Sequence, residues 1–140
     1  MSVAATGSGW KTAAVNEIPP VKPDWPATWK SVRHHFGITA FGVNAVTKDT
    51  GNVLIPEHDE SESGQQELYF VHAGTFEMRF GDGSSHRMEA GAVARVDPAT
   101  VRSFANVGEG DVILFITGAK GGYVGRDGRL PEGAPPPPRP

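Results

Sequence analysis

The sequence predicts an all-β fold, and three observations support this prediction. Short segments in which apolar and polar residues alternate follow one another from residue 38 to residue 117, and this period of two is typical of strands with one buried face. The chain contains 18 glycines and 12 prolines, a composition that favours turns and short strands over long helices. A chain of 140 residues fits one domain, because a domain of this size removes about two-thirds of its unfolded surface from water.

The N-terminal segment differs from the rest of the chain. Residues 1–23 contain IPPVKP and little periodicity, so we interpret them as an arm that can lie across a partner subunit. A short helix is expected next, because four apolar residues follow at the spacing of one helix face. They are Trp25, Trp29, Val32 and Phe36. Asp24 is placed to cap the start of this helix and Gly37 to end it, and an irregular extended segment is the alternative interpretation.

Eight strand-like segments follow, separated by short turns. They are residues 38–46, 52–56, 67–72, 75–80, 86–89, 92–96, 101–105 and 111–117. The sequence GDGSS at residues 81–85 indicates a hairpin, since Asp-Gly accepts the positive φ angles that tight hairpins need. Eight short strands predict a sandwich or barrel of jelly-roll type, which we place at residues 24–125 with its core at 38–118. The proline-rich residues 126–140 are expected to form an extended, polyproline-type tail.

The composition argues against several classes of function. Lysine and arginine number 13 against 16 aspartates and glutamates, and the net charge of −3 offers no basic surface for a nucleic-acid backbone. No run approaches the roughly eighteen apolar residues of a membrane-spanning helix, and the N-terminus lacks the pattern of a secretory signal. We therefore expect a soluble cytoplasmic protein without nucleic-acid or membrane partners. The chain has no cysteine, so any metal must be bound by imidazole and carboxylate groups.

One stretch, EHDESESGQQELYFVHAG, combines histidine, carboxylates and an apolar run. If a strand continues through its start, His58 and Glu60 point the same way, because residues two apart in a strand share a face. On the next strand Glu67 and Tyr69 likewise share a face, and Leu68 takes the opposite one. The stretch is therefore either a solvated acidic loop or the mouth of a metal or substrate site.

These residues resemble the first motif of the cupin family, and the resemblance covers roughly residues 38–118. The family motif runs glycine, a His-x-His pair, a glutamate, six residues and a glycine. The corresponding residues here are Gly51, His58, Glu60, Glu67 and Gly74. Two of the gaps are longer than in the usual form, and both fall at loops, where insertions are tolerated.

The second cupin motif is also similar. It runs glycine, five residues, a Pro-x-Gly turn, two residues, histidine, three residues and asparagine. The corresponding residues here are Gly91, Asp97, Ala99, Arg102 and Asn106, so Arg102 stands at the histidine position. The segment GQQELYFVHAG also resembles the "EELY" form of small bacterial cupins. The resemblance implies a cupin jelly-roll barrel, a fold that hosts many unrelated activities.

A cupin metal site normally supplies three histidines and one glutamate to iron, manganese, nickel or zinc. The resemblance implies His58, Glu60 and Glu67 as ligands of such a divalent metal, since oxygen ligands suit manganese or iron. Arg102 opposes this, because two unit charges ~4 Å apart at an effective dielectric near 20 interact by roughly 4 kcal/mol. The alternative is that Arg102 pairs with Glu67 or Glu60 and that this pair replaces the metal.

The pocket that the resemblance implies has further candidate residues. Arg102 can recognise a substrate carboxylate, and Tyr69 can serve as an acid or a hydrogen-bond donor, so both are candidate catalytic and substrate-binding residues. Asn44 and Phe104 lie on neighbouring predicted strands and are candidates to line the cavity.

Three functions remain open at this point. The first is a binding protein whose pocket holds a polar or carboxylate-bearing small molecule. The second is a metal-dependent cupin enzyme of oxygenase, isomerase or cyclase type. The third is a structural or partner-binding homodimer with an exchanged N-terminal arm, which outward apolar residues such as Leu68 and Phe70 suit.

Overall fold

The structure is a computed structural model that describes residues 2–21, 27–47, 53–123 and 131–135. Its elements in chain order are β1 (Ala5–Gly7), β2 (Trp10–Thr12), the 3-10 helix η1 (Val15–Glu17), β3 (Pro20–Val21), β4 (Thr28–Lys30), α1 (Val32–Phe36), β5 (Gly42–Thr47), β6 (Val53–His58), β7 (Gln66–Ala73), β8 (Thr75–Phe80), β9 (Ser85–Glu89), β10 (Val93–Val96), β11 (Arg102–Asn106) and β12 (Ile113–Ala119).

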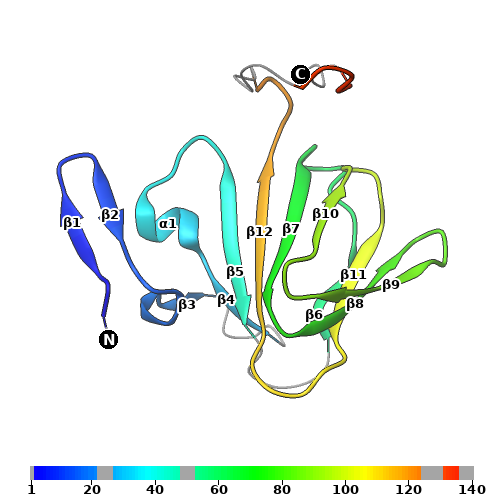
Figure 1. Cartoon of the computed structure of the whole chain (residues 1–140), viewed down its shortest axis with the longest axis horizontal. Helices are drawn as coiled ribbons and strands as arrows, with labels where there is room; N and C mark the ends of the chain where they lie inside the picture. The colour runs from blue at the N-terminus through cyan, green and yellow to red at the C-terminus, as the bar shows by residue number, and fades with distance from the viewer. Residues whose placement is uncertain (1, 22–26, 48–52, 124–130, 136–140) are drawn as a thin grey trace.

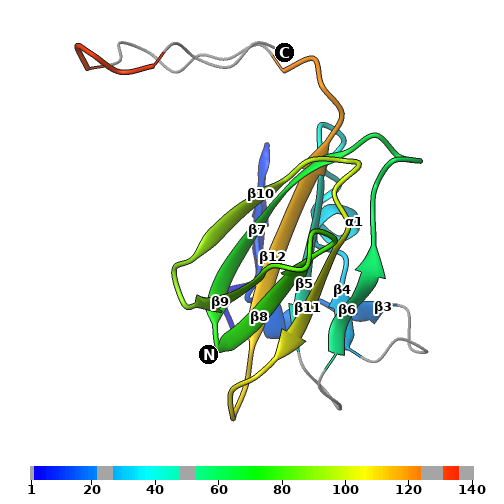
Figure 2. The same ribbon diagram turned by 90° about the vertical axis from the view of Figure 1, so that its right-hand side faces the viewer.

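Two antiparallel sheets face one another. The six-stranded sheet has the order β10-β7-β12-β5-β4-β3, and the four-stranded sheet has the order β6-β11-β8-β9. In Figure 1 the four-stranded sheet lies at the right, and the hairpin β1–β2 lies at the left beyond α1; Figure 2 gives the view from the side. The predicted all-β, jelly-roll-like fold is confirmed. Among the described residues no strand pairing joins the two sheets, so the six-stranded and the four-stranded sheet do not close into a barrel.

The core lies between the sheets and follows the alternation expected from the sequence. On β7, Tyr69 and Val71 are buried, whereas Leu68 and Phe70 are exposed on the outer face. Phe104 of the opposite sheet packs against Tyr69 with 4.8 Å between ring centroids. The period-two pattern therefore identified correctly which face of β7 is buried.

All eight predicted strands are present; β8 has the predicted bounds, and the other seven have shifted ends. The largest shift is in the first, because β5 begins at Gly42 and not at residue 38. The predicted hairpin at residues 81–85 joins β8 to β9, and Gly83 there has a φ of 88°. Within the predicted arm, β3 pairs with β4 and so extends the six-stranded sheet. No helix in the described part of the chain is long and apolar enough to cross a membrane.

The predicted helix is wrong at its start and right at its end. Trp29 lies on strand β4, paired with Val46 of β5, because burial of the indole in the core outweighs the helical spacing. The helix begins after Ser31, whose hydroxyl accepts a hydrogen bond from the His34 N–H at 3.3 Å. It ends at Gly37, which has a φ of 69°. Asp24 and Trp25, with which the predicted helix begins, lie outside the described residues. Most of the predicted proline-rich tail also lies outside them.

Candidate functional site

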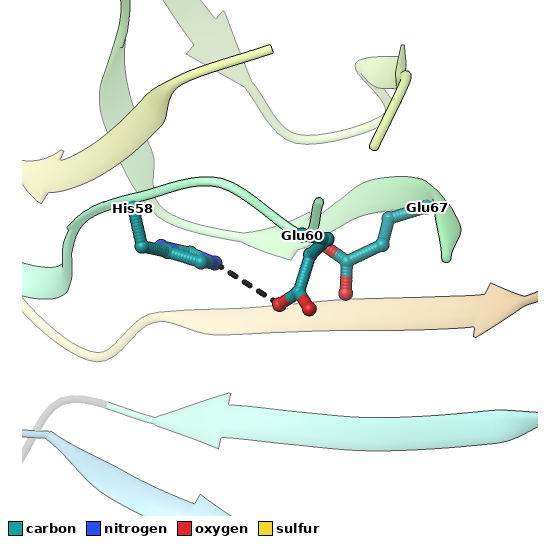
Figure 3. A group of neighbouring side chains, drawn as sticks. All are labelled: His58, Glu60 and Glu67. Carbon is teal, nitrogen blue, oxygen red and sulfur yellow. Dashed lines mark ion pairs between the residues drawn. The ribbon is translucent and has the colours of Figure 1, made fainter. Parts of the chain in front are cut away.

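Three potential metal-ligating side chains meet at one end of the space between the sheets. His58 ends β6, Glu60 lies in the loop that follows, and Glu67 lies on β7. One ligand atom from each lies within 4.8 Å of the others, and Figure 3 shows the three side chains pointing toward one another. The convergence expected from the sequence is therefore present in the structure.

The ring of His58 has a defined orientation. Its Nδ1 lies 2.8 Å from the carbonyl oxygen of Pro56. A carbonyl only accepts hydrogen bonds, so Nδ1 carries the proton and donates. In the neutral ring Nε2 then presents a lone pair, and it lies 3.4 Å from Oε1 of Glu60. A backbone acceptor behind the ring is the usual way in which a metal-binding histidine is oriented.

Glu60 reaches the cluster from a loop. The alternation in the sequence predicts a strand there, and this prediction is wrong. Strand β6 ends at His58, and the Glu60 N–H donates to the carbonyl of Pro98 at 2.7 Å. The Ser63 hydroxyl donates to Oε2 of Glu60 at 2.6 Å. One carboxylate oxygen is thus held by the loop, while the other faces His58.

Glu67 is held by two donors at the same oxygen. The Tyr69 hydroxyl and the Nη2 group of Arg102 both donate to Oε1, each at 2.7 Å. No hydrogen bond to Oε2 is made by the described residues. Burial and the charge of Glu67 raise the pKa of Tyr69 well above its usual range, so its hydroxyl stays protonated and acts here as a donor.

Arg102 lies behind the cluster. Its side chain has 0% exposure, and beside Glu67 it donates to the Tyr69 hydroxyl at 3.2 Å and to the Thr100 carbonyl at 2.6 Å. Burial disfavours its charge, but the hydrogen bonds to Tyr69 and Glu67 outweigh burial and raise its pKa. The predicted arginine–carboxylate pair is therefore present, whereas Arg102 does not reach the cavity as a substrate-binding group must.

A cavity of about 370 Å³ opens beside the cluster. Its lining consists of Trp29, Asn44, Ile55, Pro56, His58, Glu60, Gln65, Glu67, Tyr69 and Ile116. Asn44 and Tyr69 thus lie where the sequence predicted. Phe104, the other predicted lining residue, is fully buried and stacks on Tyr69, so it supports the cavity wall from the core and does not line the cavity.

Several residues at the site were missed in the sequence. Trp29 and Gln65 line the cavity, and Gly118 is the cross-strand partner of Glu67 on β12. A Cβ atom at Gly118 would lie 2.9 Å from Oε1 of Gln65 and 3.3 Å from Cγ of Glu67. A side chain at position 118 would therefore crowd Glu67 and Gln65, and glycine leaves room for both. The sequence signal for Gly118 was its place directly after the predicted strand at residues 111–117.

Comparisons with known proteins agree with the fold. Residues 50–118 match the family profile described as Cupin domain. Among solved structures, the chain is similar to the cupin domain of Schizosaccharomyces pombe Cnp3, with 16% identity over 80% of this chain and 72% of that chain and a TM-score of 0.63. It is also similar to a cupin protein from Bacteroides fragilis, with 16% identity over 94% and 99% and a TM-score of 0.62.

A third similar structure is a sugar phosphate isomerase of the cupin superfamily from Silicibacter pomeroyi. It has 19% identity over 69% of this chain and 60% of that chain, with a TM-score of 0.57. At these identities the likeness concerns the fold alone. No curated protein matches the sequence.

The fold and the cluster together define a jelly-roll protein with potential metal ligands between its sheets. The chain belongs to the cupin family, as a small cupin-domain protein.

The donors fit the divalent cation that cupins often bind. An imidazole nitrogen and two carboxylates suit manganese or iron, and each is held from behind by another group of the chain. Two carboxylates and one guanidinium leave the site with one net negative charge when His58 is neutral. The family's usual three histidines and one glutamate carry the same net charge. The charge of the site therefore still suits a cation, even with Arg102 present.

Proposed function

We propose that this chain binds a small polar molecule in the cavity between its sheets, anchored by a divalent cation that His58, Glu60 and Glu67 hold. The observation that carries the proposal is the facing of these three donors within 4.8 Å. Two carboxylates so close repel each other unless positive charge lies between them. A bound cation supplies that charge and, as a Lewis acid, polarises an oxygen of the ligand.

The chemistry of the cavity wall defines the kind of ligand. Asn44 and Gln65 offer carboxamides that can donate to and accept from a polar ligand, and Trp29 and Ile116 offer apolar surface. Arg102 has no exposed surface. A ligand carboxylate would therefore bind to the cation and not to the guanidinium. In this proposal the cation takes the role that the sequence suggested for Arg102.

Metal binding provides the test. After removal of metals with a chelator, the protein is expected to bind one Mn²⁺ per chain in isothermal titration calorimetry. His58→Ala should weaken Mn²⁺ binding by more than the about 10–100-fold that loss of an outer-shell partner costs. Glu62→Gln, which changes an exposed carboxylate of the same loop, is the matched control and should bind like the wild type. Absence of binding for Mn²⁺, Fe²⁺, Ni²⁺ and Zn²⁺, or equal binding by His58→Ala, would contradict the proposal.

The outer face of the six-stranded sheet supports a second proposal, that the chain is a homodimer. Leu68, Phe70 and Val93 are exposed by 45%, 36% and 59%. Phe70 pairs directly with Val93 on one side and with Phe115 on the other, so these three side chains form one continuous row across three strands, and Leu68 lies two residues from Phe70 on the same face. A two-fold axis lets such a row pack against its own copy, which would remove the exposed apolar surface from water.

Light scattering coupled to size exclusion tests the dimer. The wild type is expected at twice the chain mass of 14.9 kDa, and Phe70→Asp should shift it to the monomer, because burying an unpaired charge in an apolar interface is unfavourable. Val107→Asp changes a similarly exposed apolar residue outside this face and should remain dimeric. A monomeric wild type would remove the proposal.

A further inference from the structure

We infer that Arg102 and Tyr69 are positioning residues of the cation site: they fix Glu67 by one oxygen and so present the other oxygen, Oε2, to the cation. This inference rests on the proposed function, because it concerns the same site. Neither residue is a ligand in this arrangement. They act through Glu67.

The three side chains form a closed ring of hydrogen bonds. Arg102 Nη2 and the Tyr69 hydroxyl both donate to Oε1 of Glu67, at 2.7 Å each. Arg102 Nε donates to the Tyr69 hydroxyl at 3.2 Å and closes the ring. The Tyr69 hydroxyl has one hydrogen, which it donates to Glu67 in a hydrogen bond. It can therefore only accept from Arg102, so the direction of every hydrogen bond is determined. A ring of this kind leaves Glu67 little rotational freedom.

The ring also joins the two sheets. Arg102 lies on β11 of the four-stranded sheet and is the cross-strand partner of His58 on β6. Glu67 and Tyr69 lie on β7 of the six-stranded sheet. The donation from Arg102 to the Thr100 carbonyl at 2.6 Å holds the guanidinium against the segment that leads into β11. The hydrogen-bonded ring therefore constrains the position of Glu67 relative to His58, and a shared cation depends on that position.

Two effects of Arg102 on a cation oppose each other. Its positive charge repels the cation, and its hydrogen bonds place the ligand that attracts it. The guanidinium contacts Oε1 of Glu67, whereas the cation is placed at Oε2, so the carboxylate separates the two positive charges and weakens their repulsion without removing it. Loss of an outer-shell partner costs about 10–100-fold in metal affinity. We therefore expect positioning to dominate, and replacement of Arg102 to weaken cation binding.

Tyr69→Phe is the first test, because it removes one oxygen and leaves the ring stacked on Phe104 and every charge unchanged. Binding of Mn²⁺ is expected to weaken about 10-fold, and the electron paramagnetic resonance spectrum of bound Mn²⁺ should change as Glu67 gains freedom. Tyr123→Phe removes the same atom from a tyrosine that is 75% exposed and is the matched control. Unchanged affinity and an unchanged Mn²⁺ spectrum in Tyr69→Phe would overturn the inference.

Arg102→Lys and Arg102→Gln separate charge from geometry. Lysine keeps the charge without the fork of donors, and glutamine removes the charge. Positioning predicts weaker Mn²⁺ binding in both, whereas tighter binding in Arg102→Gln would show that Arg102 acts only by repulsion and would overturn the inference. If the wild type binds no metal at all, it is the proposed function that fails. A variant of Arg102 that does not fold leaves the decision to Tyr69→Phe.

Discussion

Replacing Glu67 with leucine is expected to lower the free energy of unfolding by about 3–5 kcal/mol, the range for removing one partner of a buried ion pair. The large effect arises from what remains behind. Arg102 has 0% side-chain exposure, and leucine at position 67 leaves its guanidinium charged, buried and without its carboxylate. The measurement is urea unfolding followed by far-ultraviolet circular dichroism, in chelator so that metal binding does not contribute.

The double variant Glu67→Leu/Arg102→Met provides the control. It removes both charges, and replacing a whole buried pair by apolar residues is often neutral or stabilising. The double variant should therefore be more stable than Glu67→Leu alone, which is a strong departure from additivity between contacting residues. If the two single changes add, the ion pair does not account for the loss.

Replacing Gly74 with alanine is the second change for which we expect a large loss of stability, about 2–6 kcal/mol in the free energy of unfolding. Gly74 joins β7 to β8 with a φ of 93°, a conformation that costs other residues about 1–3 kcal/mol. A Cβ atom there would overlap the Cγ1 atom of Val112 and lie 2.9 Å from its Cβ atom. Val112 is 1% exposed and has no room to move aside, so overpacking adds about 1–3 kcal/mol.

Gly83→Ala separates these two costs. Gly83 has a similar φ of 88°, and a Cβ atom there would meet nothing within 4 Å. Thermal and urea unfolding should show only the conformational cost in this variant. The difference between the variants then measures the overlap with Val112. Equal losses at both positions would show that the contact with Val112 is not the reason glycine is needed at position 74.

Both predictions concern the elements that hold the candidate site. Glu67 begins the buried face of β7, and Gly74 turns that strand into β8. Loss of the turn at Gly74 would displace β7 and with it Glu67 and Tyr69. Stability and cation binding are therefore expected to fall together in Gly74→Ala, whereas His58→Ala should affect cation binding far more than stability, because its ring lies at the cavity and is 34% exposed.

The sequence by itself determined the strands and their faces. Alternation of apolar and polar residues is a local property of an extended backbone, in which neighbouring side chains point to opposite sides. It therefore predicted that Tyr69 is buried and that Leu68 and Phe70 lie outside. The spacing of the cupin motif also selected His58, Glu60 and Glu67, because a motif preserves which positions of a fold face one another.

Only the tertiary structure decided which side chains line the cavity and which lie behind them. Arg102 and Phe104 were expected in the cavity, yet they lie behind Glu67 and Tyr69, because the separation of the two sheets is not encoded in the period of either. Glu60 lies in a loop whose path depends on a hydrogen bond to Pro98. Trp29 lies on a strand, paired with Val46, and not in the predicted helix. Each outcome depends on contacts between residues far apart in the chain, which no local pattern records.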